Sequence, residues 1–228
     1  LFSLIGNHPD VRKAVSSDFK RTGDAIYLLG QTHQELGASE LSYMLREEGR
    51  GGIGGAIPRI DAERNLAAYR ALSTAMSDGL VASAHDCSDG GLAVALAECC
   101  FGAGAGASVT INGLWSDCEH LDTWGALFGE SLGRILVSIR PEDCEAFEST
   151  MADHSCHLLG AVTPGDEITF YRDGVDGVAS PGDPGWSHAL SAAPPAPGGE
   201  FVDLANAVKE PTTFGAGLSG GSCIGRYF

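Results

Sequence analysis

Short apolar runs, each bounded by turn-forming residues, recur through the first 172 residues of the chain. The clearest of them, Ala25–Leu29 (AIYLL), is closed by Gly30, and this pattern is typical of a buried strand. Similar runs predict further strands at Leu80–Ala84, Val109–Ile111, Arg134–Ile139, Leu158–Val162 and Ile168–Tyr171.

Between these runs the apolar residues recur at helical spacing. Ser39 is expected to cap a helix that continues to about Glu48, and Asp61 to cap a longer helix that ends at Gly79. Four residues of the longer helix are expected to face the core: Leu66, Tyr69, Leu72 and Met76. Two more helices are expected at Leu92–Cys100 and Pro141–His154. The alternation of strands and helices predicts an α/β (α+β) fold, with a mixed sheet flanked by helices.

The texture of the sequence changes after residue 172. Six of the ten prolines lie between Pro181 and Pro211, among clustered Gly, Ala and Ser. Such a segment buries too little apolar surface to offset the entropy of ordering it. We therefore expect one domain over residues 1–172 and an irregular Pro/Gly-rich tail over residues 173–228.

Charge and cysteine content narrow the classes of partner. The 228-residue chain has a net charge of −16, which disfavours a nucleic acid polymer as partner, although a small phosphorylated ligand accompanied by magnesium is compatible with it. The sequence has no run of about 18 or more apolar residues, so no membrane association is expected. Seven cysteines, an odd number without CxxC spacing, indicate reduced thiols and a cytoplasmic protein.

The string Ser83–Glu98 (SAHDCSDGGLAVALAE) carries the candidate chemistry. An apolar strand is expected to place His85 and Asp86 at its carboxyl end, where open α/β sheets bind their ligands. Ser88 or Asp89 is expected to cap the helix that follows. By this pattern alone, a capped helix after a tight turn, with no ligand, is an equally open interpretation.

The two glycines of this string, Gly90 and Gly91, would allow a ligand to approach the backbone closely. Free amides at the start of a helix favour a phosphate group. The carboxylate of Asp86 is a hard oxygen ligand, suited to a magnesium ion that phosphate oxygens already coordinate. The string is therefore a candidate site for a magnesium-bound phosphate.

This string resembles the second-half signature of the phosphoribosylformylglycinamidine synthases, the PurL family. Three other segments occur in the order found in that family: Phe19–Glu40 (FKRTGDAIYLLGQTHQELGASE), Leu127–Ile139 (LFGESLGRILVSI) and Leu158–Ile168 (LLGAVTPGDEI). The resemblance covers roughly residues 1–172, and the tail does not share it. The central Ser-Asp-Gly-Gly differs from the Thr-Gly-Gly-Gly of aminoimidazole ribonucleotide (AIR) synthetases and from the Arg-Gly-Gly of hydrogenase-maturation relatives.

The resemblance implies an AIR synthase C-terminal-domain-like fold and a role in an ATP-dependent ligase. The family converts formylglycinamide ribonucleotide to the amidine in purine biosynthesis, using ATP and ammonia derived from glutamine. This chain looks like the carboxy-terminal domain of the second half, inactive alone. Its partners would be the amino-terminal domains of the same enzyme and a glutaminase domain or subunit. The family's catalytic histidines and remaining magnesium carboxylates lie in domains outside this chain.

Residue roles carried over from the family fall on the same string. The resemblance assigns magnesium to Asp86 and a nucleotide, ATP or ADP, to Ser88, with His85, Gly90 and Gly91 beside it. Two alternatives remain: a non-catalytic interaction domain that a nucleotide stabilises, and another ATP-dependent enzyme of the AIR synthase fold.

A second motif aligns with the loop that binds the ribonucleotide substrate in the first half of the family's enzymes. It comprises Glu130, Ser131 and Arg134. In the second half this loop is the pseudo-symmetric counterpart, a possible substrate-like loop. The alternative is an ion pair between Glu130 and Arg134 at the end of a strand, worth under about 1 kcal/mol.

Overall fold

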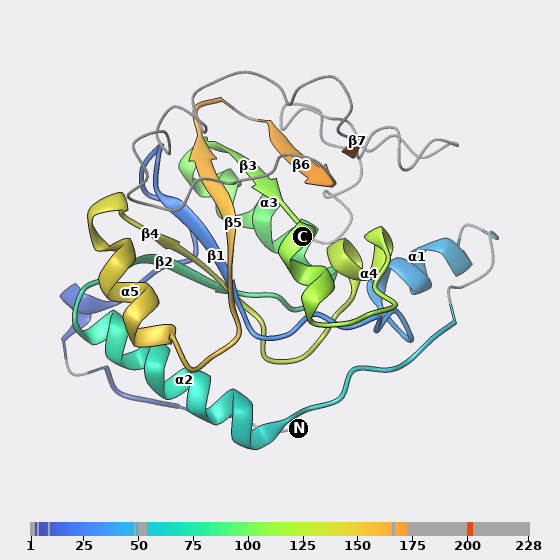
Figure 1. Ribbon diagram of the computed structural model, residues 1–228, viewed down its shortest axis with the longest axis horizontal. Helices are drawn as coiled ribbons and strands as arrows, with labels where there is room; N and C mark the ends of the chain where they lie inside the picture. Colours follow the sequence, from blue (N-terminus) through green and yellow to red (C-terminus); the bar gives the residue numbers. More distant parts are fainter. Residues whose placement is uncertain are drawn as a thin grey trace.

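The computed structural model describes residues 3, 5–8, 10–47, 49, 54–165, 167–172 and 200–202. The strands form one seven-stranded mixed sheet in the order β2-β4-β1-β5-β3-β6-β7 (Figure 1). All neighbouring strands are antiparallel except β3 and β6, which are parallel. The strands are β1 (Ala25–Leu29), β2 (Val81–Asp86), β3 (Gly106–Thr110), β4 (Ile135–Ile139), β5 (Cys156–Thr163), β6 (Ile168–Arg172) and β7 (Glu200–Val202).

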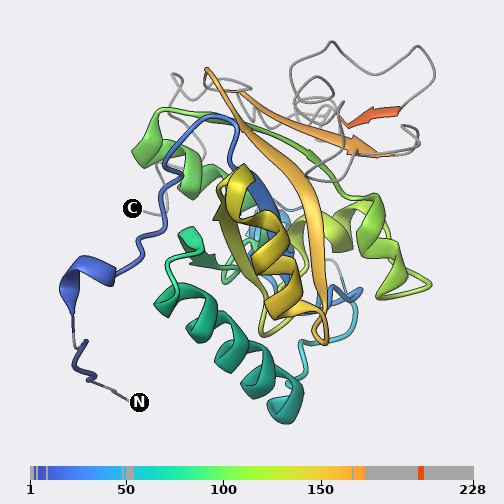
Figure 2. The same cartoon turned by 60° about the vertical axis from the view of Figure 1, so that its left-hand side comes forward.

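Helices cover both faces of the sheet. The α-helices are α1 (Glu40–Glu47), α2 (Ala62–Ser77), α3 (Gly91–Ala103), α4 (Thr123–Phe128) and α5 (Cys144–Met151), and the 3-10 turns are η1 (Val11–Lys13), η2 (Asn112–Ser116) and η3 (Pro141–Asp143). Helices α2 and α5 pack on one face, and α1, α3 and α4 on the other (Figures 1 and 2). This arrangement confirms the predicted α/β class with a mixed sheet.

Strand β1 lies inside the sheet, and this position explains its uninterrupted apolar sequence. Ile26 and Leu28 point into the core shared with α3 and α4, whereas Ala25, Tyr27 and Leu29 point into the core shared with α2 and α5. All five side chains are buried. A strand covered on both faces needs apolar residues at every position, because successive side chains alternate between the faces.

The predicted boundaries hold to within a few residues for most elements. Asp61 caps α2 by accepting the Arg64 N–H, and Ser39 Oγ accepts the Ser42 N–H (3.2 Å) at the start of α1. Strand β2 is longer than predicted, because its last residue is Asp86. The predicted helix from Pro141 is divided into η3 and α5, and α4 was not predicted.

The predicted core face of α2 is wrong in part. Leu66 and Tyr69 are 50% and 41% exposed, and the residues that α2 buries are Ala68, Leu72 and Ala75. The stripe of small residues lets the helix lie close to α5. The large side chains at Leu66 and Tyr69 consequently flank this contact and face outward.

The predicted tail lies mostly outside the described residues. Within it, Glu200–Val202 forms β7, which pairs with β6, and the irregular character expected for the rest stays a prediction. In the described part of the chain no helix combines the length and apolar character needed to span a bilayer. The six cysteines found there are free: Cys87, Cys99, Cys100, Cys118, Cys144 and Cys156.

Candidate functional site

Three loops meet at one end of the sheet. In the antiparallel register, Ile135 at the start of β4 lies opposite both Leu29 at the end of β1 and Asp86 at the end of β2. The loops after β1, after β2 and before β4 therefore converge. These loops hold the three most informative segments of the sequence, although up to about a hundred residues separate them along the chain.

Asp86 presents its carboxylate to solvent at this end of the sheet. Its side chain is 71% exposed. The Ser88 hydroxyl donates a hydrogen bond to Asp86 Oδ2, and His85 Nδ1 lies 3.5 Å from Asp86 Oδ1. The Ser88 hydrogen bond, with a smaller contribution from His85, lowers the pKa of Asp86, so this carboxylate is ionised at neutral pH.

His85 is bound on its other side by Glu98, a residue that the sequence did not single out. His85 Nε2 lies 2.7 Å from Glu98 Oε2 on α3, and both side chains are partly buried. Glu98 lies seven residues, or about two helical turns, after Gly91, so it shares the face of α3 on which the helix begins. That spacing was the available signal for it.

The start of α3 is not capped as predicted. Its N-cap residue is Gly90, which makes no side-chain capping bond, so the predicted cap by Ser88 or Asp89 is wrong. The Gly90 N–H donates instead to Glu130 Oε1 (2.9 Å), and the Gly91 N–H donates to the Ser88 carbonyl (3.1 Å). Neither amide is free, so the prediction that free N–H groups of Gly90 and Gly91 favour a phosphate is wrong.

Contacts within the protein also explain why residue 91 is a glycine. Gly91 has a φ of +68°, and a Cβ at this position would lie 2.5 Å from the carbonyl oxygen of Gly129 and 2.9 Å from that of Leu127. The helix start therefore packs directly on the backbone that ends α4. Close packing of two backbone segments, and not the approach of a ligand, requires glycine here.

Ser131 and Arg134 are buried and hydrogen-bonded within the protein, and their predicted place in a substrate-like loop stays a prediction. Each is only 1% exposed, and Ser131 Oγ accepts the His33 N–H (3.0 Å). The Arg134 guanidinium donates to the Gly129 carbonyl, and its remaining contacts are with the Ser131 carbonyl (3.4 Å) and Thr32 Oγ1 (3.3 Å). Burial lowers the pKa of this guanidinium.

The alternative ion pair at this strand end is not formed. Among the described residues, the charged groups of Glu130 and Arg134 do not come within ion-pairing distance. Instead, Glu130 Oε1 accepts the backbone N–H groups of Gly90 and of Glu40 (2.8 Å). Glu130 thus joins the starts of α3 and α1.

A magnesium ion fits only one part of this site. In the described ranges no group of three His, Cys, Asp or Glu side chains gathers in a way that could hold a metal. Magnesium, however, commonly binds through one or two carboxylates, keeping water and phosphate oxygens as its other ligands. The ionised, exposed Asp86 fits that mode of binding, with the Ser88 hydroxyl beside it.

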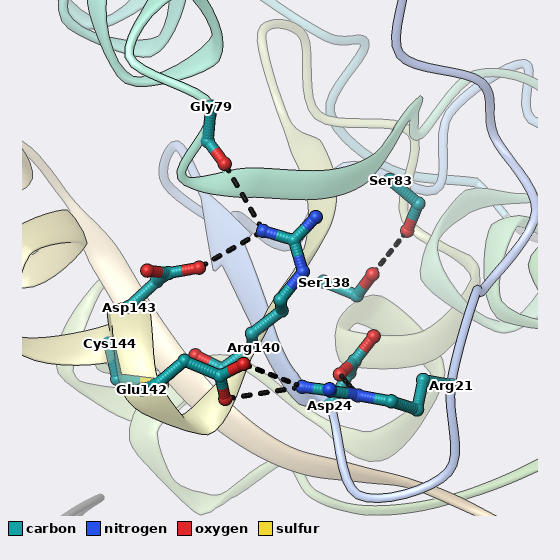
Figure 3. A network of polar contacts seen from close by, with 9 residues as sticks. All are labelled: Arg21, Asp24, Gly79, Ser83, Ser138, Arg140, Glu142, Asp143 and Cys144. Carbon is teal, nitrogen blue, oxygen red and sulfur yellow. Dashed lines mark hydrogen bonds and ion pairs between the residues drawn. The ribbon is translucent and has the colours of Figure 1, made fainter.

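A second charged network lies at the opposite end of the sheet (Figure 3). Arg21 bonds both Asp24, which is 1% exposed, and Glu142. Among the described residues Asp24 Oδ2 has no hydrogen-bond partner, and burial raises the pKa of this carboxyl despite the neighbouring Arg21. Arg140 completes the network by bonding Asp143 and the Gly79 carbonyl. None of these residues belongs to the candidate site.

The fold and these loops define an AIR-synthase-like domain. The family model described as AIR synthase related protein, C-terminal domain, matches residues 21–173, and the chain belongs to that family.

Solved structures of similar fold come from Thermotoga maritima. PurL complexed with FGAR is 20% identical with a TM-score of 0.58, and the match covers 70% of this chain and 27% of that one. PurL complexed with ATP (19% identity, TM-score 0.56) and phosphoribosylformylglycinamidine synthase II (19%, 0.55) are each matched over 70% of this chain and 25% of theirs. The chain thus spans about a quarter of the length of these proteins.

Proposed function

We propose that this chain is the carboxy-terminal domain of the second ATP-fold half of a phosphoribosylformylglycinamidine synthase. The resemblance of four ordered segments supports this assignment, as does the fold shared with PurL structures that carry FGAR or ATP. The domain would be part of a cytoplasmic ligase of purine biosynthesis. It would act with the enzyme's amino-terminal domains and a glutaminase domain or subunit, and would be inactive alone.

The domain's contribution would be a wall of a nucleotide–magnesium site at the end of β2. The observation that carries this proposal is the exposed, ionised carboxylate of Asp86 beside the Ser88 hydroxyl. Bound magnesium would neutralise the charge of the phosphates of ATP or ADP. Asp86 would bind the metal, Ser88 would bind the nucleotide, and His85, fixed by Glu98, would hold Asp86 in place.

The test compares nucleotide binding to the intact protein and to its Asp86→Ala variant. MgADP at a hundred times its dissociation constant should raise the free energy of unfolding by about 2.7 kcal/mol, and the variant should lose most of this gain. Asp153→Ala, which removes an exposed carboxylate beyond α5, should keep it. If MgADP stabilises Asp86→Ala as much as the wild type, the site is not here.

A second function is favoured by the internal bonds of the turn. Because Gly90 and Gly91 already have protein partners, the turn has a complete structural explanation without a ligand. The domain could therefore stabilise and join its neighbours, with a nucleotide serving only an auxiliary role. An intact Asp86→Ala protein that binds no nucleotide here, yet forms the amidine at the wild-type rate, would establish that role.

A further inference from the structure

Glu130 lies between the starts of two helices, a position that its sequence motif did not predict. One oxygen of its carboxylate, Oε1, accepts backbone N–H groups from the starts of two helices, Gly90 at α3 (2.9 Å) and Glu40 at α1 (2.8 Å). Charge-assisted hydrogen bonds of this kind are about twice as strong as neutral ones. Both amides also lie at the positive ends of helix dipoles, where an anion is favoured.

The turn that carries Asp86 and Ser88 depends on this carboxylate at one end. At the other end, Asp86 pairs with Ile135 in the sheet, and the Cys87 N–H donates to the Arg134 carbonyl (3.0 Å). The turn is thus hydrogen-bonded along the segment 130–135. The hydrogen bond from Gly90 to Glu130 is the last contact between the turn and that segment. Gly90 comes directly after Ser88 and Asp89 in the sequence.

Glu130 is itself firmly placed. Its backbone N–H donates to the Glu35 carbonyl (3.2 Å), and the neighbouring Ser131 hydroxyl accepts the His33 N–H. The buried Arg134 donates back to the Gly129 carbonyl, which precedes Glu130. A carboxylate on a loop held by these hydrogen bonds can fix the position of the turn that it contacts.

We propose that Glu130 is a positioning residue of the nucleotide–magnesium site. Its carboxylate takes the anion position at the starts of α1 and α3, and holds the Asp86–Gly90 turn in the geometry that binds metal. A phosphate group then cannot use the Gly90 amide, and must reach the domain through the metal at Asp86 and through Ser88. This inference rests on the proposed function and specifies how that site is built.

The experiment measures magnesium-dependent ADP binding by the intact protein and three variants. Supporting groups behind a metal ligand typically change metal affinity by 10- to 100-fold, and Glu130→Ala should weaken MgADP binding by about that factor and raise the magnesium concentration needed for half-saturation. Glu130→Gln keeps an oxygen acceptor but loses the charge that strengthens both hydrogen bonds, so it should weaken binding measurably, though less than Glu130→Ala. Glu145→Ala, an exposed glutamate of α5, should match the wild type.

Hydrogen exchange separates a local effect from general unfolding. In Glu130→Ala the amides of Gly90 and Glu40 should lose protection, while amides of the central strand β1 keep theirs. Should Glu130→Ala fail to fold, Glu130→Gln decides. A higher magnesium concentration for half-saturation in that variant, with unchanged β1 protection, supports the proposal, whereas binding equal to the wild type overturns it.

Two results distinguish this inference from the function on which it rests. If the wild type binds MgADP and Glu130→Ala binds it equally well or more tightly, Glu130 is no positioning residue and the proposed site stands. Tighter binding would mean that the carboxylate competes with phosphate for the Gly90 amide. If the wild type does not bind MgADP at all, the proposed function fails first, and the role of Glu130 fails with it.

Discussion

Replacing Gly91 by alanine tests why the motif contains glycine. At Gly91 the added Cβ would meet the carbonyl oxygens of Gly129 and Leu127 at 2.5 and 2.9 Å, and both are backbone atoms that no side-chain rotation can move away. The backbone also has a φ of +68°, which an L-residue adopts at a cost of roughly 1–2 kcal/mol. Overpacking of this kind typically adds about 1–3 kcal/mol.

We therefore expect Gly91→Ala to lower the free energy of unfolding by about 2–5 kcal/mol. At about 2–4 °C per kcal/mol for a domain of this size, the melting temperature should fall by about 4–20 °C. Gly104, at the other end of α3, supplies the matched control. Its φ is +58°, but a Cβ there would meet no atom within 4 Å, so Gly104→Ala should show only the conformational cost.

The assay is urea unfolding of the purified chain, followed by circular dichroism, with both variants measured beside the wild type. The difference between the two variants isolates the contact with the backbone at 127–129. Losses that agree to within about 0.5 kcal/mol, the usual error of additivity, would refute the reasoning. The glycine would then be open to a ligand, as the sequence pattern first suggested.

Two further predictions concern buried charge. Burial raises the pKa of Asp24 above its ordinary value of 3.8, so at pH values between these two the folded state binds more protons than the unfolded state. The contribution of this group to stability therefore decreases as the pH rises through that interval. Relative to the wild type, Asp24→Asn should gain stability with rising pH there, and a difference that stays flat in urea titrations at several pH values would contradict this. Arg134→Ala leaves the Gly129 and Ser131 carbonyls buried without their donor, which should cost about 2–6 kcal/mol in urea unfolding. Arg64→Ala, which breaks a half-exposed ion pair with Asp61, should cost under about 1 kcal/mol, and an equal loss in both arginine variants would contradict the buried role.

Local patterns predicted most of the fold because they coincide with burial. The run Ala25–Leu29 was recognisable as a strand since it needed apolar residues on both faces. The same reasoning failed for α2, where hydrophobicity favoured Leu66 and Tyr69 over alanine. Which stripe of a helix is buried depends on how closely it approaches its neighbours, and Ala68 and Ala75 allow the close approach to α5.

The site was predictable as far as it is local in sequence. A strand followed by a polar turn indicated that Asp86 would end β2 at the surface, and it does. The partners of the turn were not predictable, because Glu130 lies forty residues after Gly90 and reaches it only through the pairing of β2 with β4. A pattern of glycines near a helix start specifies available amides, but it does not specify which anion binds them.

The distribution of anions at this end of the sheet accounts for both the structural and the proposed functional role of the loops. One carboxylate oxygen of Glu130 accepts hydrogen bonds from the starts of α1 and α3, whereas Asp86 points to solvent and retains its charge. If a phosphate took the Gly90 amide, that acceptor would be redundant and the exposed carboxylate would repel the ligand. With the Gly90 and Gly91 amides already hydrogen-bonded, a phosphate beside Asp86 would be favourable only if a cation lay between the two anions. The proposed magnesium-dependent mode of binding would therefore use both carboxylates.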